Sequence, residues 1–318
     1  MLVRDEDDIL AETIENILKW IDFLYVFDTG STDSTVEILR EYARKDERVK
    51  IHFASPVVFN QNIRSALFEI YRGNFKNGDW IVKLDADEIY YVTPPDFVRN
   101  KLNNNESCVY LTWYYFRLTD NEVNGYESGR IDIHEDRKRS IIDRRRFYFV
   151  PEYSEPRMFL YRNTMSWGEN LAFPANAGYI AKERIPVLHY PHRDTLQMQK
   201  RFKLRSTVNK THGYAGRHWN IDDWRLEVVK TELPFSNELD RPALGLASIK
   251  GLDVSEIQYW SKDERLPQIK YLNHIKPPFK RLFQWLLYRS VISVIDRFRR
   301  KTSEDFVSKF KQSNPIND

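Results

Sequence analysis

Residues 23–33 read FLYVFDTGSTD, a short apolar run followed by an aspartate and a polar turn that contains glycine. Five consecutive apolar residues between Asp22 and Asp28 predict a buried strand, because a strand covered on both faces needs no polar alternation. Gly30 permits a tight turn, and the hydroxyls that follow it, together with Asp33, can cap a helix. This stretch therefore predicts a strand that passes through a tight turn into a helix.

The same alternation of strands and helices extends to both sides of this stretch. Apolar spacing predicts helices over 8–19, over 60–71 and from a Ser34-Thr-Val-Glu37 capping box onward, and apolar runs predict strands at 49–53 and 80–84. A first strand at Leu2-Val3 has two or three residues, against about five or six in most strands, so it is either a stub or the remainder of a longer strand. Such alternation predicts an α/β fold with a mostly parallel, Rossmann-like central sheet.

Beyond residue 100 the pattern predicts strands at 109–116, 157–161 and 185–190 and becomes helical from Thr195. We therefore predict an α/β domain over residues 1–200, with halves at about 1–100 and 101–200. A helical C-terminal extension is expected over residues 201–318.

Composition excludes several classes of protein. The 318 residues are 42% hydrophobic and 30% charged, which suits a folded chain, and the net charge of +3 gives no case for nucleic-acid binding. The single cysteine, Cys108, excludes an intrachain disulfide and a cysteine-rich zinc site. The acidic residues near Met1 do not suit a secretion signal, and there is no apolar run of 18 residues. A cytoplasmic location is expected.

Two acidic motifs follow predicted strands. Asp28 ends the first apolar run, where ligands of parallel sheets bind, and is well placed to accept hydrogen bonds from a base imide or a ribose hydroxyl. Asp85-Ala-Asp87-Glu88 follows the run WIVKL. An extended chain directs Asp85 and Asp87 to the same side, where two carboxylates can share a divalent cation. Three carboxylates so close together would repel one another without a cation. The alternative interpretation is a strand-to-helix turn for the first motif and a solvated turn for the second.

Taken together, the two motifs, 85 − 28 = 57 residues apart, resemble those of the family 2 glycosyltransferases with the GT-A fold. Arg4-Asp-Glu6 and the helix start Phe59 to Leu67 also match, although Ser65 replaces the usual asparagine. The segment Leu188-His-Tyr-Pro-His-Arg193 resembles the subgroup that builds lipopolysaccharide cores and related cell-surface glycans. The resemblance covers about residues 1–205.

This resemblance implies roles for individual residues. The residues implied to contact the nucleotide sugar are Arg4, Glu6, Asp28, Arg64 and Asp85. The residues implied to bind Mn²⁺ or Mg²⁺ are Asp85, Asp87 and His189. The alternative for His189 is a histidine packed at a strand end. His192 is left as a structural or acceptor-facing residue.

An inverting transfer also needs a carboxylate base for the acceptor hydroxyl. The resemblance implies Glu169, in Ser166-Trp-Gly-Glu169-Asn, although Gly168 stands where histidine is usual. Its rivals as the base are Glu152, Glu155 and Asp132. Trp167 is expected to stack on an acceptor sugar ring, unless it belongs to the core.

Two basic segments have both a structural and a functional interpretation. Residues 137–146 contain six basic residues in ten, which form either a solvated face or a grip on an anionic acceptor. Residues 276–301 contain eight basic residues and one acid, and the helix expected at about 279–300 is amphipathic. That helix either packs on the domain or holds the protein at the cytoplasmic face of a membrane as a peripheral protein.

The sequence thus predicts a divalent-metal-dependent, inverting hexosyltransferase that uses a nucleotide-sugar donor, with a UDP-sugar favoured. The expected acceptor is a glycan or a lipid-linked molecule. One alternative is a sugar-phosphate nucleotidyltransferase, although Arg4-Asp-Glu6 lacks the Gly-rich basic loop of that class. The other is a catalytically degenerate glycan-binding protein.

Overall fold

The computed structural model describes residues 1–53, 62–151, 154–168, 171–212, 223–231, 246–247 and 258–259. The chain forms two compact units. The first contains Met1–Thr112 and Glu152–Val187, and the second contains Trp113–Pro151 and Leu188–Gln268. Strands β6 (Cys108–Arg117) and β9 (Ile185–His189) each begin in the first unit and end in the second.

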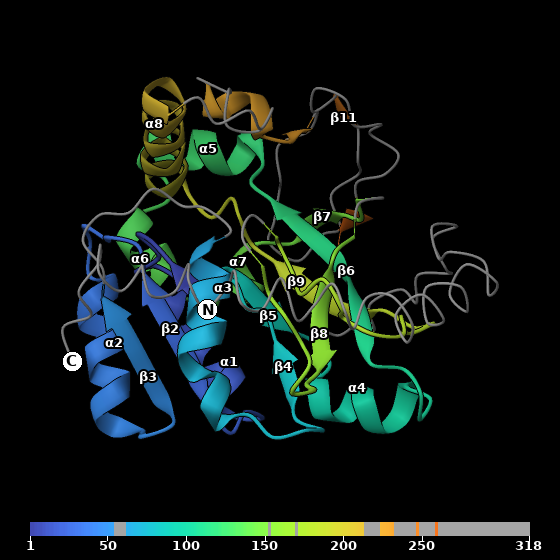
Figure 1. The fold of residues 1–318 in the computed structure, drawn as a ribbon. Coiled ribbons are helices and arrows are strands. Elements are labelled where there is room, and N and C mark those ends of the chain that lie inside the picture. Colours follow the sequence, from blue (N-terminus) through green and yellow to red (C-terminus); the bar gives the residue numbers. More distant parts are fainter. Residues whose placement is uncertain are drawn as a thin grey trace. The chain divides into compact units, whose positions relative to one another are not determined.

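The first unit begins with the predicted alternation of strands and helices (Figure 1). Strands β1 (Leu2–Val3), β2 (Leu24–Asp28) and β3 (Val49–Phe53) form a parallel sheet in that order. Leu2 pairs with Phe27 and Val3 with Asp28, while β2 pairs with β3 along its whole length. The predicted α/β fold with parallel strands and flanking helices is confirmed.

Three helices accompany these strands, and apolar spacing explains their packing. In α1 (Leu10–Leu18) and α3 (Asn62–Tyr71), residues three and four apart are buried. Leu67 and its neighbours on α3 form one core cluster with Leu2 and Phe27. Helix α2 (Thr35–Lys45) packs along β3. The predicted capping box at its start is wrong, because the Ser34 side chain makes no capping bond and Asp33 Oδ1 accepts from the Thr35 amide instead, at 2.9 Å.

Strand β8 (Pro156–Leu160) forms antiparallel pairs in another part of the first unit. It pairs with β4 (Trp80–Val82) and with the first half of β6. Strand β5 (Glu88–Tyr90) pairs with β9, and α4 (Pro94–Lys101) follows β5. The sequence predicted a buried strand at 80–84, but all three residues of β4 are half-exposed.

The second unit contains helices within residues 120–150, for which the sequence predicted no regular elements. Helices α5 (Asp120–Glu127), α6 (Ile133–Arg137) and α7 (Ile141–Arg144) precede β7 (Phe147–Phe149), which pairs with the second half of β6. Helix α8 (Thr195–His212) confirms the helical pattern expected from Thr195. Short strands β10 (Lys230–Thr231), β11 (Leu246–Ala247) and β12 (Gln258–Tyr259) complete the described elements.

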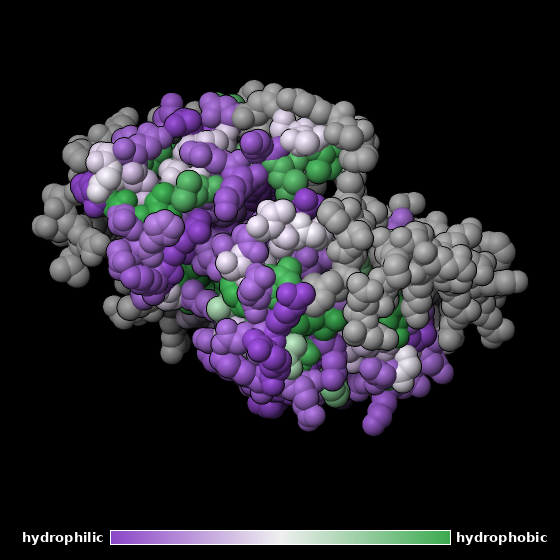
Figure 2. Space-filling view, turned by 90° about the vertical axis from the view of Figure 1, so that its left-hand side faces the viewer, coloured by the Kyte–Doolittle hydropathy of each residue, from purple (hydrophilic) through white to green (hydrophobic). Residues whose placement is uncertain are grey.

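Among the residues that Figure 2 colours, hydrophilic ones cover the larger area, with smaller groups of hydrophobic residues between them. Among the described residues, no helix is both long and apolar enough to span a bilayer. The predicted amphipathic helix at about 279–300 lies outside the described residues, so its role stays a prediction. Most of the predicted extension over 201–318 lies outside them too, and the boundary near residue 200 also stays a prediction.

Candidate active site

Strand β1 brings the two acidic motifs of the first unit to its two sides. Val3 pairs with Asp28 on β2, and the adjacent Leu2 forms a parallel bridge with Asp85. Neighbouring strands lie about 4.8 Å apart, so one strand between Asp28 and Asp85 separates their backbones by about 10 Å. The structure thus brings together two motifs that lie far apart in sequence.

The Asp28 carboxylate organises the turn that follows it. Its Oδ1 accepts hydrogen bonds from the amides of Gly30 and Ser31, both at 2.9 Å, and its Oδ2 accepts from the Ser31 hydroxyl at 2.5 Å. Asp28 is 2% exposed, and Gly30 has a positive φ of 96°, which glycine adopts without strain. The turn interpretation of Asp28 therefore holds in this structure, and any contact to a nucleotide would come in addition to these bonds.

A second loop, after β1, is tied to this turn. Asp5, at a positive φ of 54°, accepts from the Thr32 amide at 2.6 Å through Oδ1, while its own amide donates to the Ser31 hydroxyl at 2.9 Å. The predicted donor-site residues Arg4 and Glu6 flank it. Arg4 Nε lies 3.8 Å from the Asp5 carboxylate, and the Glu6 amide donates to Thr35 Oγ1 at 2.8 Å.

The Asp85-Ala-Asp87 segment is a turn between β4 and β5. The extended chain that was predicted for Asp85 to Asp87 is therefore wrong. Helix α1 contacts this turn: the buried Thr13 hydroxyl donates a hydrogen bond to the Ala86 carbonyl at 2.7 Å. Asp87 is 4% exposed, and its negative charge opposes the larger effect that the neighbouring cations have on the pKa of Asp85.

Two arginines hold Asp85. Arg64 on α3 lies 2.5 Å from Oδ1, and Arg157 on β8 lies 2.7 Å from Oδ2. Burial would raise the pKa of Asp85, but the charges of Arg157, Arg64 and Lys83 outweigh it and hold the pKa well below its usual range. The cation that the sequence argument required for this acidic cluster is therefore supplied, at least in part, by arginine.

Arg157 is the centre of this network. Its side chain is fully buried and also pairs with Glu88, itself 0% exposed, and with Glu155 at 3.2 Å. Lys83 Nζ lies 2.8 Å from Glu155. Burial, with the nearby Arg157 and Arg64, lowers the pKa of Lys83 to about 8. The sequence analysis missed Arg157 and Lys83 as site residues. The excess of carboxylates at 85–88 could have indicated these two residues, because buried carboxylates need cations from other elements as partners.

The described residues contain no group of three or more His, Cys, Asp or Glu side chains that could hold a metal ion. This does not conflict with the donor chemistry, because Mg²⁺ is usually bound by one or two carboxylates and substrate phosphates. Asp87 and Asp85 supply such oxygens. His189, the third predicted ligand, belongs to the second unit, where its ring lies 4.6 Å from that of Tyr115. The metal site stays a prediction.

The two residues predicted for the acceptor side have different outcomes. Trp167 is 3% exposed, packs against Phe68 and Phe159, and donates its indole N–H to the Leu171 carbonyl at 2.8 Å. The indole thus packs in a core cluster, which matches the alternative interpretation, and its stacking on an acceptor sugar stays a prediction. Glu169 lies outside the described residues, so its role as base stays a prediction.

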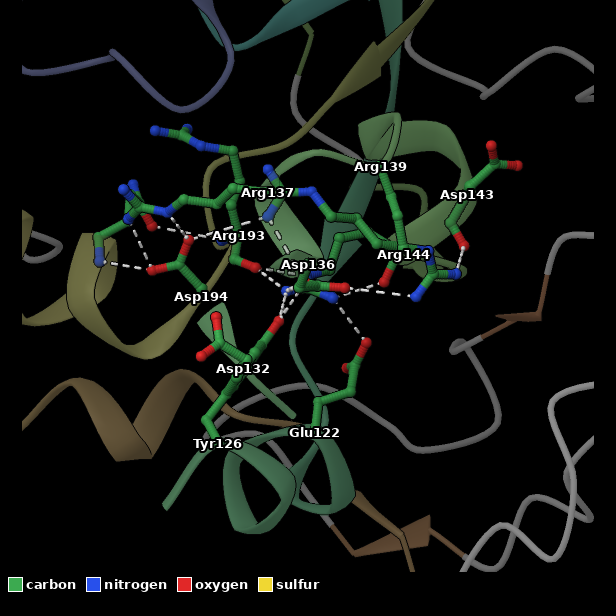
Figure 3. Close-up of polar contacts among 12 residues, drawn as sticks. Glu122, Tyr126, Asp132, Asp136, Arg137, Arg139, Asp143, Arg144, Arg193 and Asp194 are labelled. Atoms are coloured by element: carbon green, nitrogen blue, oxygen red, sulfur yellow. Dashed lines mark hydrogen bonds and ion pairs between the residues drawn. The ribbon is translucent and has the colours of Figure 1, made fainter. Parts of the chain in front are cut away.

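Acidic side chains of the second unit pair with the basic segment 137–146, and Figure 3 shows Arg137, Arg139 and Arg144 among such partners. All six basic residues have an acidic partner within 4 Å: Arg137 with Asp194, Lys138 with Glu135, Arg139 and Arg144 with Asp136, Arg145 with Glu122, and Arg146 with Asp143. Arg144 and Arg145 are also almost completely buried. The structure therefore favours a structural role over a grip on an anionic acceptor. His192 is likewise buried, with Nδ1 2.7 Å from Arg117.

A family model and one curated relative match this chain. The model described as Glycosyl transferase family 2 matches residues 1–179, and the chain belongs to that family. A TPR repeat-containing protein of Synechococcus elongatus is 31% identical over 110 residues, or 35% of this chain. The match spans a quarter, 25%, of the length of that relative.

Proposed function

We propose that this protein transfers a hexosyl group from a nucleotide-sugar donor, a UDP-sugar in the first instance, to a glycan or lipid-linked acceptor of the cell surface. Its family supports the reaction class. The observation that carries the proposal is the placement of Asp28 and Asp85 on either side of β1, at the carboxyl ends of parallel strands. Ligands of open α/β sheets bind at this edge.

The nucleotide contacts follow from this placement. Asp28 and the loop after β1, with Arg4 and Glu6, lie on one side of β1, and Asp85 with Arg64 lies on the other. In our proposal the base or ribose binds near Asp28, and the ribose and diphosphate bind near Asp85. Arg64 and Arg157 fix the position of the Asp85 carboxylate for such contacts.

Expulsion of a nucleoside diphosphate requires neutralisation of its charge. We propose that Asp87, with an oxygen of Asp85, holds Mn²⁺ or Mg²⁺, and that His189 completes the set of ligands. The bound cation would stabilise the charge that develops on the leaving diphosphate. Asp87 is buried beside the half-exposed Asp85, so its carboxylate is held in place before a ligand arrives.

Inverting transfer requires a base for the acceptor hydroxyl, and the structure weighs against two rivals of Glu169. Glu155 is paired with Lys83 and Arg157, and these charges outweigh its burial and lower its pKa, which makes it a weaker base. Asp132 uses its carboxylate to cap α6. Glu169 therefore remains the proposed base. Its other rival, Glu152, also lies outside the described residues.

A second candidate function, glycan binding without transfer, rests on one observation. Both carboxylate oxygens of Asp85 are engaged by arginine, which leaves this residue less available to a metal ion. A direct measurement of transfer separates the two functions.

The test is nucleoside diphosphate release from a panel of nucleotide sugars, with Mn²⁺, with Mg²⁺ and with chelator. We expect release that depends on the cation, and a loss of about a thousandfold for Asp87→Asn, the equivalent of roughly 4 kcal/mol in the transition state. Asp22→Asn, at an exposed position before β2, is the matched control. Activity that is indifferent to chelator would remove the metal from the proposal, and donor binding without release would favour the second function.

We also propose that the protein acts at the cytoplasmic face of a membrane through the predicted helix at 279–300. Flotation with anionic liposomes at low salt tests this. A full-length protein that stays in the soluble fraction would leave that helix only a packing role.

A further inference from the structure

The two arginines that hold Asp85 differ in how firmly they are themselves held. The Arg157 side chain is 0% exposed and contacts Asp85 at 2.7 Å, Glu155 at 3.2 Å and the fully buried Glu88. A buried guanidinium that leaves one carboxylate loses its charge neutralisation and gains no water in return. Because three carboxylates fix it away from solvent, Arg157 is a permanent partner of Asp85 Oδ2.

Arg64 is held by weaker contacts. It is the third residue of α3, and its guanidinium lies 2.5 Å from Asp85 Oδ1, with a longer contact of 3.4 Å from Nη1 to the Leu84 carbonyl. The Arg64 side chain is 10% exposed and that of Asp85 is 29% exposed, so solvent reaches this ion pair. The contact between Arg64 and Asp85 is therefore the one that a ligand can replace at the lower cost.

The charge of the network indicates what could replace Arg64. The network contains three cationic and four anionic side chains, which are those of Lys83, Arg64 and Arg157, and of Asp85, Asp87, Glu88 and Glu155. At pH 7 these seven groups carry a net charge of 3 − 4 = −1. Without Arg64 the other six carry −2, which is the charge that one divalent cation neutralises. The guanidinium that leaves Asp85 then needs an anionic partner of its own, and a diphosphate is one.

We propose that Arg64 pairs with Asp85 Oδ1 in the unliganded protein and releases this oxygen to a divalent cation when a nucleoside diphosphate binds and accepts the guanidinium. Arg157 keeps Oδ2 throughout. This exchange rests on the proposed function, because it takes Asp85 and Asp87 as the residues that hold the cation. It explains how Asp85 can serve a metal site although arginines engage both of its oxygens.

The exchange couples the two ligands. A cation that binds alone displaces Arg64 without giving it a new partner, and a diphosphate that binds alone finds Arg64 still paired with Asp85. Only the two together satisfy every charge, and Mg²⁺ in proteins is commonly bound in this way, by one or two carboxylates and the phosphates of a substrate. The unmodified protein should therefore bind Mn²⁺ weakly in the absence of a nucleotide.

The experiment measures two affinities of the full chain. Electron paramagnetic resonance of the unbound ion gives the affinity for Mn²⁺ alone, and calorimetry gives the affinity for UDP with Mn²⁺ in excess. Arg64→Met should bind Mn²⁺ alone about tenfold more tightly than the unmodified protein, because Oδ1 is open and the network is more negative. The same variant should bind UDP with Mn²⁺ about tenfold more weakly, because the diphosphate has lost its arginine.

Opposite changes in the two affinities distinguish the exchange from a merely structural role of Arg64, whose loss would weaken both. Arg72→Met is the matched control. Arg72 is 11% exposed and pairs with Glu69 of the same helix, outside the network, so both affinities should stay unchanged. Arg64→Lys keeps the positive charge and should return the affinity for Mn²⁺ alone toward that of the unmodified protein.

Two outcomes count against the exchange, and they differ in what they leave standing. If UDP binding responds to Mn²⁺ but Arg64→Met binds Mn²⁺ alone no more tightly than the unmodified protein, the exchange is overturned and the metal site remains. If Mn²⁺ changes the UDP affinity of none of these proteins, the metal assignment of the proposed function is overturned and the exchange with it.

Discussion

Replacement of Arg157 by methionine tests whether this arginine neutralises the acidic cluster at 85–88. The change removes a fully buried guanidinium that contacts Asp85 at 2.7 Å, Glu155 at 3.2 Å and the buried Glu88. Methionine keeps much of the apolar volume, so the cost comes mainly from the carboxylates that lose their partner. Removal of one partner from a buried ion pair costs about 3–5 kcal/mol. We expect the free energy of unfolding at pH 8 to fall by that amount.

The pH dependence of this loss distinguishes electrostatics from packing. Without Arg157, burial raises the pKa of Glu88 above its value of about 4.3 in the unfolded chain. The folded variant then binds more protons than its unfolded state, so its stability falls as the pH rises and recovers as the pH drops from 8 to 5. We expect the difference from the unmodified protein to shrink over this interval in urea unfolding followed by tryptophan fluorescence.

The chain offers a matched control in Arg99→Met. Arg99 pairs with Asp96 at 3.0 Å, but the two side chains are 71% and 51% exposed, so the loss should stay within about 1 kcal/mol. Adding Glu88→Gln to Arg157→Met should recover part of the stability, because it removes one of the carboxylates left without a partner. The reasoning fails if Arg157→Met costs no more than Arg99→Met, or if its cost is the same at pH 5 and pH 8.

Three further changes test other parts of the site. Asp28→Ala should raise KM for the nucleotide sugar about tenfold with a smaller effect on kcat, because a group that holds the nucleotide equally in ground and transition states contributes uniform binding; steady-state kinetics would contradict this if kcat fell at constant KM. Glu169→Gln should bind donor normally by calorimetry and lose transfer, since an amide cannot take up the acceptor proton, and near-normal turnover would transfer the role to Glu152. Lys83→Met should remove a rise in stability between pH 8 and pH 10 of up to about 3 kcal/mol, because the pKa of Lys83 is lowered to about 8 in the folded protein and the unfolded chain binds the extra proton in that interval. Equal pH profiles of urea unfolding for the two proteins would count against it.

Local chemistry made much of the site predictable. Asp28 and Asp85 each follow an apolar run, and parallel strands end at one edge of a sheet, so their approach could be expected before any tertiary contact was known. Arg64 was expected near the nucleotide only through the resemblance to the family, and it lies 2.5 Å from Asp85. The role of Arg157 could not be read in the same way, because it depends on an antiparallel pairing between β4 and β8 that no sequence period specifies.

The basic segment 137–146 is a second case in which the sequence could not show how charges are paired in the fold. Six cations in ten residues suggested an anion site. Four of them pair with acids at residues 135–143, and the other two pair with Glu122 and Asp194, which lie outside the segment. Charge density along a chain indicates a binding surface only when the fold leaves those charges unpaired. Here the fold pairs them (Figure 3).

The sequence by itself determined the order of strands and helices from β1 to β4 and the position of the two acidic motifs, because apolar periodicity and turn residues act over a few neighbours. The tertiary structure alone decided which cations meet those acids and that Trp167 is a core residue. These features depend on contacts between residues distant in sequence, where burial and pairing are set by the packing of whole elements and not by local propensity.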